Sequence, residues 1–103
     1  MMRTVWKYSI PYMREVVGTF FVPSGARIVH VAPEVLNPGS LSDPAVSVWF
    51  EVDRGAEREA RVFELFGTGH DIPEGAGEHV GSVVVPPLVL HLYERISDDE
   101  EQS

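Results

Sequence analysis

Short apolar stretches separated by proline and glycine recur along the whole chain. They are rich in Val, Ile, Phe, Trp and Tyr, the residue types that strands favour. Eight prolines and nine glycines interrupt them at short intervals, as turns between strands do. The pattern predicts seven short strands, at residues 4–10, 16–22, 26–32, 45–52, 58–66, 79–85 and 88–94.

Alternation inside the strands indicates which side of each strand faces the core. In residues 45–52 the even positions carry Val and Phe, whereas the odd positions are mixed. We therefore expect the even side of this strand to face the core. In residues 26–32 the odd positions Val29 and Val31 form the more apolar side, and Pro33 is expected to end that strand.

Residues 56–66 fit both a helix and a strand. Asp53 is a suitable residue to cap a helix, the apolar residues lie at helical spacing, and Gly67 would end it. Against a helix, β-forming side chains crowd the end of the segment, and the residues after Asp53 resemble a hairpin turn. We therefore predict a strand at 58–66 that forms a hairpin with residues 45–52.

Because helices are nearly absent from this pattern, the sheets must cover one another. The sequence predicts an all-β fold, a small sandwich or flattened barrel of about seven short, mostly antiparallel strands. Residues 1–96 are expected to form one β domain, since a chain of 103 residues supports a single core. Residues 97–103 hold four acidic residues and nothing apolar, which predicts a disordered acidic tail. The longest loop is expected at residues 33–44.

The charge balance argues against two classes of partner. Sixteen acidic and eight basic side chains give a net charge of −8, which disfavours binding to nucleic acid and to anionic membranes. No apolar run is long enough to span a bilayer and no secretory signal is recognised, so we expect a cytoplasmic protein. Cysteine is absent, which excludes disulfides and thiolate chemistry.

Four segments of the chain carry a resemblance. They are Thr4-Val5-Trp6-Lys7-Tyr8, Pro23-Ser24-Gly25-Ala26-Arg27-Ile28, Phe63-Glu64-Leu65-Phe66-Gly67-Thr68-Gly69-His70 and His91-Leu92-Tyr93-Glu94. In order and spacing they resemble a family of small uncharacterised bacteriophage proteins, over residues 4–94. The resemblance implies a phage gene product that acts in the host cytoplasm. It implies no activity, substrate or catalytic residue.

The loop formed by Gly67, Thr68, Gly69 and His70 is the first candidate binding site. Two glycines let the backbone turn with its N–H groups exposed to an anion, while the hydroxyl and the imidazole add hydrogen-bonding groups. A phosphorylated metabolite or a signalling nucleotide fits this chemistry. The alternative is a tight turn with positive φ at both glycines, in which Thr68 and His70 bond carbonyl groups of the loop itself. The lysine and the helix of a P-loop are missing.

Four aromatic residues, Trp6, Tyr8, Trp49 and Tyr93, are the candidate partner contacts. Trp6 and Tyr8 share one side of a strand, where they either pack against the sheet or form a platform for a partner. An exposed apolar surface that includes Trp49 and Tyr93 would cost about 25 cal/mol per Å². A second copy would cover such a surface, so we expect a homodimer.

Neither metal chemistry nor catalysis is expected. The spacing of the four histidines matches no common ligand pattern, so we predict no metal site and no cofactor; these residues are His30, His70, His79 and His91. No serine stands in a nucleophile elbow. Glu51 and Asp53 share one side of a strand but fit a solvated hairpin edge. A minor alternative is an enzyme with His70 as general base beside Asp71 or Glu94.

These features favour a small noncatalytic phage accessory protein that binds a host component, a host protein or a small ligand, in the host cytoplasm. The evidence for this interpretation is mainly the lack of paired ligands or an activated nucleophile in so short a chain. The alternative is a protein that binds and sequesters a small ligand at the loop of residues 67–70.

Overall fold

Seven strands and one short 3₁₀ helix make up the described part of the chain. The structure is a computed structural model that describes residues 2–35 and 44–95. The elements are β1 (Arg3–Ile10), β2 (Val17–Pro23), β3 (Arg27–Val35), β4 (Pro44–Asp53), β5 (Arg58–Gly67), η1 (Glu74–Ala76), β6 (Glu78–Val85) and β7 (Leu88–Glu94). Most of the predicted 33–44 loop and the predicted acidic tail lie outside the described residues.

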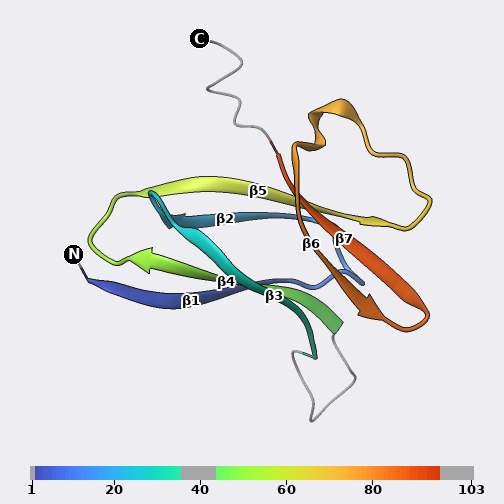
Figure 1. Ribbon diagram of the computed structural model, residues 1–103, viewed down its shortest axis with the longest axis horizontal. Helices are drawn as coiled ribbons and strands as arrows, with labels where there is room; N and C mark the ends of the chain where they lie inside the picture. The colour runs from blue at the N-terminus through green and yellow to red at the C-terminus, as the bar shows by residue number, and fades with distance from the viewer. Residues whose placement is uncertain (1, 36–43, 96–103) are drawn as a thin grey trace.

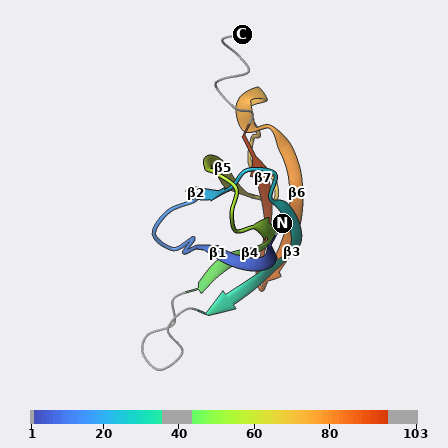
Figure 2. The same cartoon turned by 90° about the vertical axis from the view of Figure 1, so that its left-hand side faces the viewer.

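The strands form two antiparallel sheets that lie against each other (Figures 1 and 2). The three-stranded sheet has the order β1-β4-β3, and the four-stranded sheet has the order β2-β5-β7-β6. The predicted all-β sandwich of seven antiparallel strands is therefore confirmed, without closure into a barrel. No helix among the described residues has the length and apolar character needed to cross a membrane.

The predicted hairpin between β4 and β5 is wrong. β4 pairs with β1 and β3, whereas β5 pairs with β2 and β7, so the two strands belong to different sheets. Asp53 Oδ1 accepts a hydrogen bond from Gly55 N at 3.0 Å in the turn that follows β4. The apolar sides of the strands meet across the sandwich, where the Phe50 and Phe63 rings lie 6.0 Å apart edge to face.

The expected inward side of the third strand is also wrong in part. A β-bulge between Ile28 and His30 shifts the alternation, so Ile28 and Val31 pack on the core while Val29 is 43% exposed. Pro33 lies within β3 instead of ending it, and the strand continues to Val35. This is tolerated because β3 is an edge strand, where a missing N–H need not break the ladder.

The core lies between the two sheets. From the three-stranded sheet, the expected even positions of β4 are all buried, namely Val46, Val48, Phe50 and Val52. The four-stranded sheet faces them with apolar residues from each of its strands; the largest buried ones are Phe20, Phe63 and Leu92. Phe20 connects the layers, since its ring stacks on Tyr8 at 5.0 Å and lies 5.3 Å from Phe63. The sequence pattern therefore identified the core of β4 correctly.

One ion pair closes an end of the core. The Arg61 guanidinium donates two hydrogen bonds to the Glu94 carboxylate, at 2.6 and 2.7 Å, and a third to Ala26 O at 2.7 Å. It also lies 5.3 Å from the centre of the Phe50 ring and 5.8 Å from that of Phe63. The hydrogen bonds to Glu94 raise the pKa of Arg61, although burial acts in the opposite direction. This charge therefore joins β5, β7 and the turn before β3.

Candidate functional site

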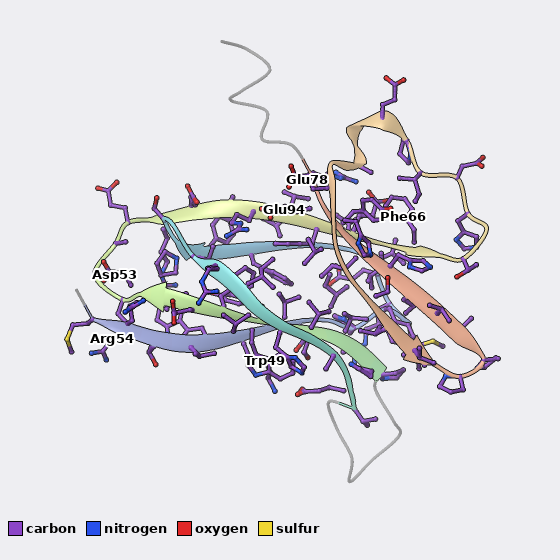
Figure 3. The ribbon with its side chains drawn as sticks, viewed as in Figure 1. Trp49, Asp53, Arg54, Phe66, Glu78 and Glu94 are labelled. Carbon is purple, nitrogen blue, oxygen red and sulfur yellow. The ribbon has the colours of Figure 1, made fainter. Side chains whose placement is uncertain are left out.

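The four candidate aromatic residues lie in three separate places. Trp6 and Tyr8 are on β1, at the edge of the three-stranded sheet. Trp49 lies in the centre of that sheet, and Tyr93 belongs to the four-stranded sheet. In Figure 3, Trp49 lies far from Phe66, whose ring packs edge to face on Tyr93 at 5.5 Å. The four residues therefore cannot form one continuous surface.

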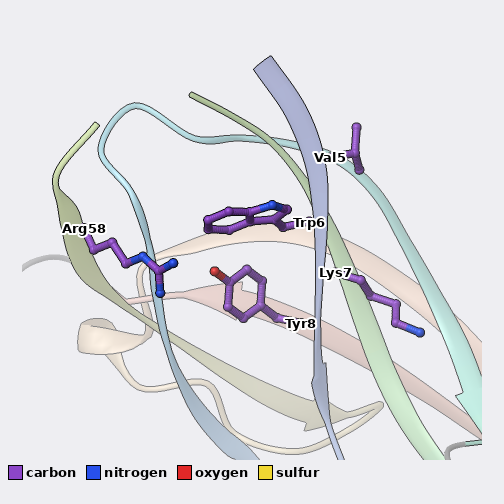
Figure 4. Close-up of a pocket in the computed structure, with 5 residues that line it drawn as sticks. All are labelled: Val5, Trp6, Lys7, Tyr8 and Arg58. Atoms are coloured by element: carbon purple, nitrogen blue, oxygen red, sulfur yellow. The ribbon is translucent and has the colours of Figure 1, made fainter. Parts of the chain in front are cut away.

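A shallow and largely open groove lies beside β1 and contains two of these aromatic residues. It has a volume of about 420 Å³ and is lined by Val5, Trp6, Lys7, Tyr8 and Arg58. Trp6 and Tyr8 extend from β1 toward Arg58, which comes from the start of β5 (Figure 4). The Arg58 guanidinium lies 5.0 Å from the centre of the Trp6 ring, within the range of a cation–π contact. Arg58 carries no signal in the sequence that links it to Trp6 and Tyr8, because it lies about 50 residues away in the chain.

The two cations of the groove differ in their partners. Lys7 Nζ forms an ion pair with Glu34, at 2.8 and 3.0 Å from the carboxylate oxygens, and it lies 5.9 Å from the centre of the Trp49 ring. Within residues 2–35 and 44–95, no ion pair joins Arg58 to a carboxylate. Arg58 is therefore the cation that can bind an external anion.

Tyr8 has a structural role as well as a place in the groove. Its hydroxyl donates a hydrogen bond to Phe21 O of β2 at 2.9 Å. Its ring also packs on Phe20 and Phe50. The side chain therefore connects the two sheets and has a fixed position. Trp6 packs against the margin of the core and is half-buried beside Arg58, so it is the better candidate for contact with a partner.

The Gly67–His70 loop is a tight turn. His70 N donates to Gly67 O at 3.1 Å, Gly67 N donates to His70 Nδ1 at 3.3 Å, and Gly69 has a φ of 89°. Gly67 does not have a positive φ, in contrast to the turn expected from the sequence. Two N–H groups that were candidates for anion binding are thus used within the loop.

A chain of hydrogen bonds connects this loop to the four-stranded sheet. Thr68 Oγ1 bonds His91 Nε2 at 2.9 Å, and Ser82 Oγ bonds both His91 Nδ1 at 2.7 Å and His79 Nε2 at 2.9 Å. In neutral rings the Ser82 hydroxyl can donate to one imidazole and accept from the other. The hydrogen bonds to Thr68 and Ser82 are sufficient to explain how the His79 and His91 rings are oriented, without a bound ligand.

Part of this arrangement could have been found from the sequence. The residues around the Pro86-Pro87 turn pair as Val85 with Leu88, and the same register places Ser82 opposite His91. The turn of a short hairpin determines how its two strands are aligned, so the Pro86-Pro87 turn would have been enough to predict that Ser82 lies opposite His91. The position of His79 was not accessible in this way, because a bulge between His79 and Gly81 shifts the register.

Metal and acid–base candidates are dispersed. The part of the chain that the structure describes contains no group of three or more potential ligands that could hold a metal ion. His30 packs on Trp49 at 5.1 Å, away from the other histidines. Glu51 lies near Arg3 and Arg27, at 3.3 and 3.4 Å. Glu94 is held by Arg61, which uses the carboxylate that was considered for acid–base chemistry with His70.

The full length of the chain, residues 1–103, matches one family model, described as a domain of unknown function (DUF7352). The chain belongs to this family. Comparison with curated proteins and with solved structures finds no match. The resemblance to bacteriophage proteins and the host location therefore stay predictions.

Proposed function

We propose that this DUF7352 protein is a noncatalytic binding protein that docks a segment of another protein in the groove beside β1. The observation that supports this most directly is the half-buried Trp6 beside Arg58, in a groove of about 420 Å³. Tryptophan and arginine are the residue types that contribute most often to binding energy at protein interfaces. The resemblance to phage proteins adds the expectation that the partner is a host protein in the host cytoplasm.

The groove provides both apolar contact and charge. Because Trp6 is already half-buried, covering the rest of its ring adds on the order of 1 kcal/mol. Arg58 can supply charge-assisted hydrogen bonds to a carboxylate of the partner. A useful affinity therefore needs further contacts along β1 and not the tryptophan alone.

The alternative, a small ligand at the Gly67–His70 loop, has less support. The N–H groups of Gly67 and His70 bond within the loop, and the Thr68 hydroxyl bonds His91. A ligand would have to replace these hydrogen bonds, so part of its own binding energy would be lost. This alternative and the predicted homodimer stay hypotheses.

The test compares capture of a partner by variants of the tagged chain expressed in host cells. A protein identified by mass spectrometry should bind the purified wild-type chain, and Trp6→Ala or Arg58→Glu should each weaken that binding at least tenfold. Trp49→Phe is the control, because Trp49 lies on the same sheet outside the groove. The proposal fails if no protein is retained, or if the retained protein binds the Trp6→Ala and Arg58→Glu variants as well as it binds the wild type.

A further inference from the structure

The two sheets have four edge strands, because β1, β3, β2 and β6 each have one neighbour. An edge strand presents unpaired backbone N–H and C=O groups that can pair with another chain. Three of these edges carry an interruption. The pairing of β3 is shifted between Ile28 and His30, and that of β6 between His79 and Gly81. In β2 the carbonyl of Phe21 already accepts the Tyr8 hydroxyl.

β1 is the regular edge. All eight of its residues, from Arg3 to Ile10, pair with β4 without a register shift. The strand contains neither glycine nor proline, and most of its residues favour β structure. Lys7 could protect such an edge, but its ammonium group is held across the outer face of the sheet by Glu34. The fold therefore leaves this edge able to accept another strand.

The register shows which residues of β1 have free backbone groups. Arg54 N donates to Met2 O at 3.0 Å, so Met2 points its carbonyl toward β4. In an antiparallel pair this direction alternates from residue to residue. The even residues of β1 therefore bond β4, while Val5 and Lys7 each direct an N–H and a C=O away from it. Both of these residues also line the groove.

The charge of the groove indicates which chain would fit. Its five lining residues include no acidic residue, although the whole protein has a net charge of −8. Of the two cations, Lys7 is paired with Glu34 and extends from β1 away from Arg58 (Figure 4). Arg58, the other cation of the groove, has no carboxylate partner among the described residues. The β1 strand of a second copy contains no acidic residue that could pair with Arg58. An acidic segment of another protein is favoured instead.

We infer that β1 binds an extended acidic segment of another protein by strand addition, with backbone pairing at Val5 and Lys7 and a partner carboxylate at Arg58. This inference rests on the proposed function and specifies its binding mode. Backbone hydrogen bonds provide the affinity in such a mode, and the side chains of alternate residues provide the selectivity. It also accounts for the further contacts that Trp6 alone does not supply.

The direct test uses a ten-residue peptide of alternating Thr and Val with two central Glu residues, at millimolar concentration with the full chain. Amide exchange is followed by NMR. We expect exchange at Val5 and Lys7 to slow at least tenfold, with little change at Trp6 and Tyr8, whose amides already bond β4. A twin peptide with Lys in place of Glu should bind at least tenfold more weakly. A twin with N-methyl groups on alternate residues should give no protection.

Three results would overturn the inference. One is the absence of protection at Val5 and Lys7 with the acidic peptide. Another is equal binding by the N-methylated or lysine twin. The third is protection that appears without peptide and rises with protein concentration together with a dimer in sedimentation, which would identify a second copy as the occupant of the edge.

A pair of variants separates failure of this binding mode from failure of the proposed function. Val5→Pro removes an outward N–H, whereas Val5→Ala keeps it and shortens the same side chain. A captured partner should lose at least tenfold in affinity with Val5→Pro and change little with Val5→Ala, once circular dichroism shows that both variants fold. If capture depends on Trp6 and Arg58 but not on the Val5 N–H, the groove binds a partner and strand addition is wrong. If Val5→Pro does not fold, the peptide series decides.

Discussion

Replacement of Arg61 tests whether the ion pair at the end of the core holds the sandwich together. In Arg61→Met the guanidinium is lost, and with it two hydrogen bonds to Glu94 and one to Ala26 O. The side chains of Arg61 and Glu94 are only 18% and 25% exposed, so solvent screens this pair weakly. Removing one partner of such a pair leaves a poorly solvated charge, for which about 3 kcal/mol is expected.

The matched control is Arg95→Met. Arg95 contacts Glu64 at 2.6 Å, the same distance as in the Arg61 pair, but its side chain is 43% exposed. An exposed pair contributes roughly 1 kcal/mol or less. Urea unfolding followed by tryptophan fluorescence measures both losses in the free energy of unfolding. Equal losses in Arg61→Met and Arg95→Met would refute the assignment of a structural role to the Arg61 charge.

A double-mutant cycle adds a second criterion. Glu94→Gln in the Arg61→Met background removes the unpaired carboxylate, so the double variant should be about 1 kcal/mol more stable than Arg61→Met alone.

The raised pKa of Arg61 also fixes the sign of the pH dependence. A basic group whose pKa is higher in the folded state than in the unfolded state stabilises the fold fully at any pH below its unfolded pKa. This stabilisation is lost only as the pH rises through the pKa of the folded state. The contribution of the Arg61 ion pair to the free energy of unfolding should therefore stay constant near neutral pH.

The remaining predictions concern the loops. Gly77→Ala should lower the free energy of unfolding by more than about 3 kcal/mol, because Gly77 has a φ of 90° and an added Cβ would collide with the Glu94 carbonyl. The control is Gly75→Ala, where an added Cβ has no neighbour within 4 Å, and thermal unfolding should show almost no change. Ser82→Ala should cost about 1 kcal/mol and shift both histidine ring signals in NMR, since Ser82 bonds two imidazoles. His70→Ala should stay within about 1 kcal/mol of the wild type in urea unfolding, because the ring is exposed.

The strands themselves followed from short-range features of the chain. β7 spans Leu88–Glu94, as the pattern predicts, and the other strands differ from their predicted ranges by a few residues at the ends. Residue preference, alternation and turn residues act over a few positions, so they can be evaluated without the rest of the fold. The same holds for the choice of strand over helix at residues 58–66.

Strand partners did not follow in this way. The buried side of β5 carries Phe63 and Leu65, and such an apolar side can form a core with another one either beside it in the same sheet or across from it in the other sheet. β4 and β5 pack across the sandwich, and the bulges in β3 and β6 changed which residues face inward. Pairing over long sequence separations depends on the packing of the whole core, which no local pattern contains.

The candidate sites show the same division. The sequence alone determined the seven strands, the apolar positions of β4 and the excess of acidic charge, because these depend on neighbouring residues or on composition. Only the tertiary structure decided that Arg58 lies over Trp6 and that β1 is the regular free edge. Residues so far apart in the chain meet only when two sheets have packed, so the groove is a property of that packing.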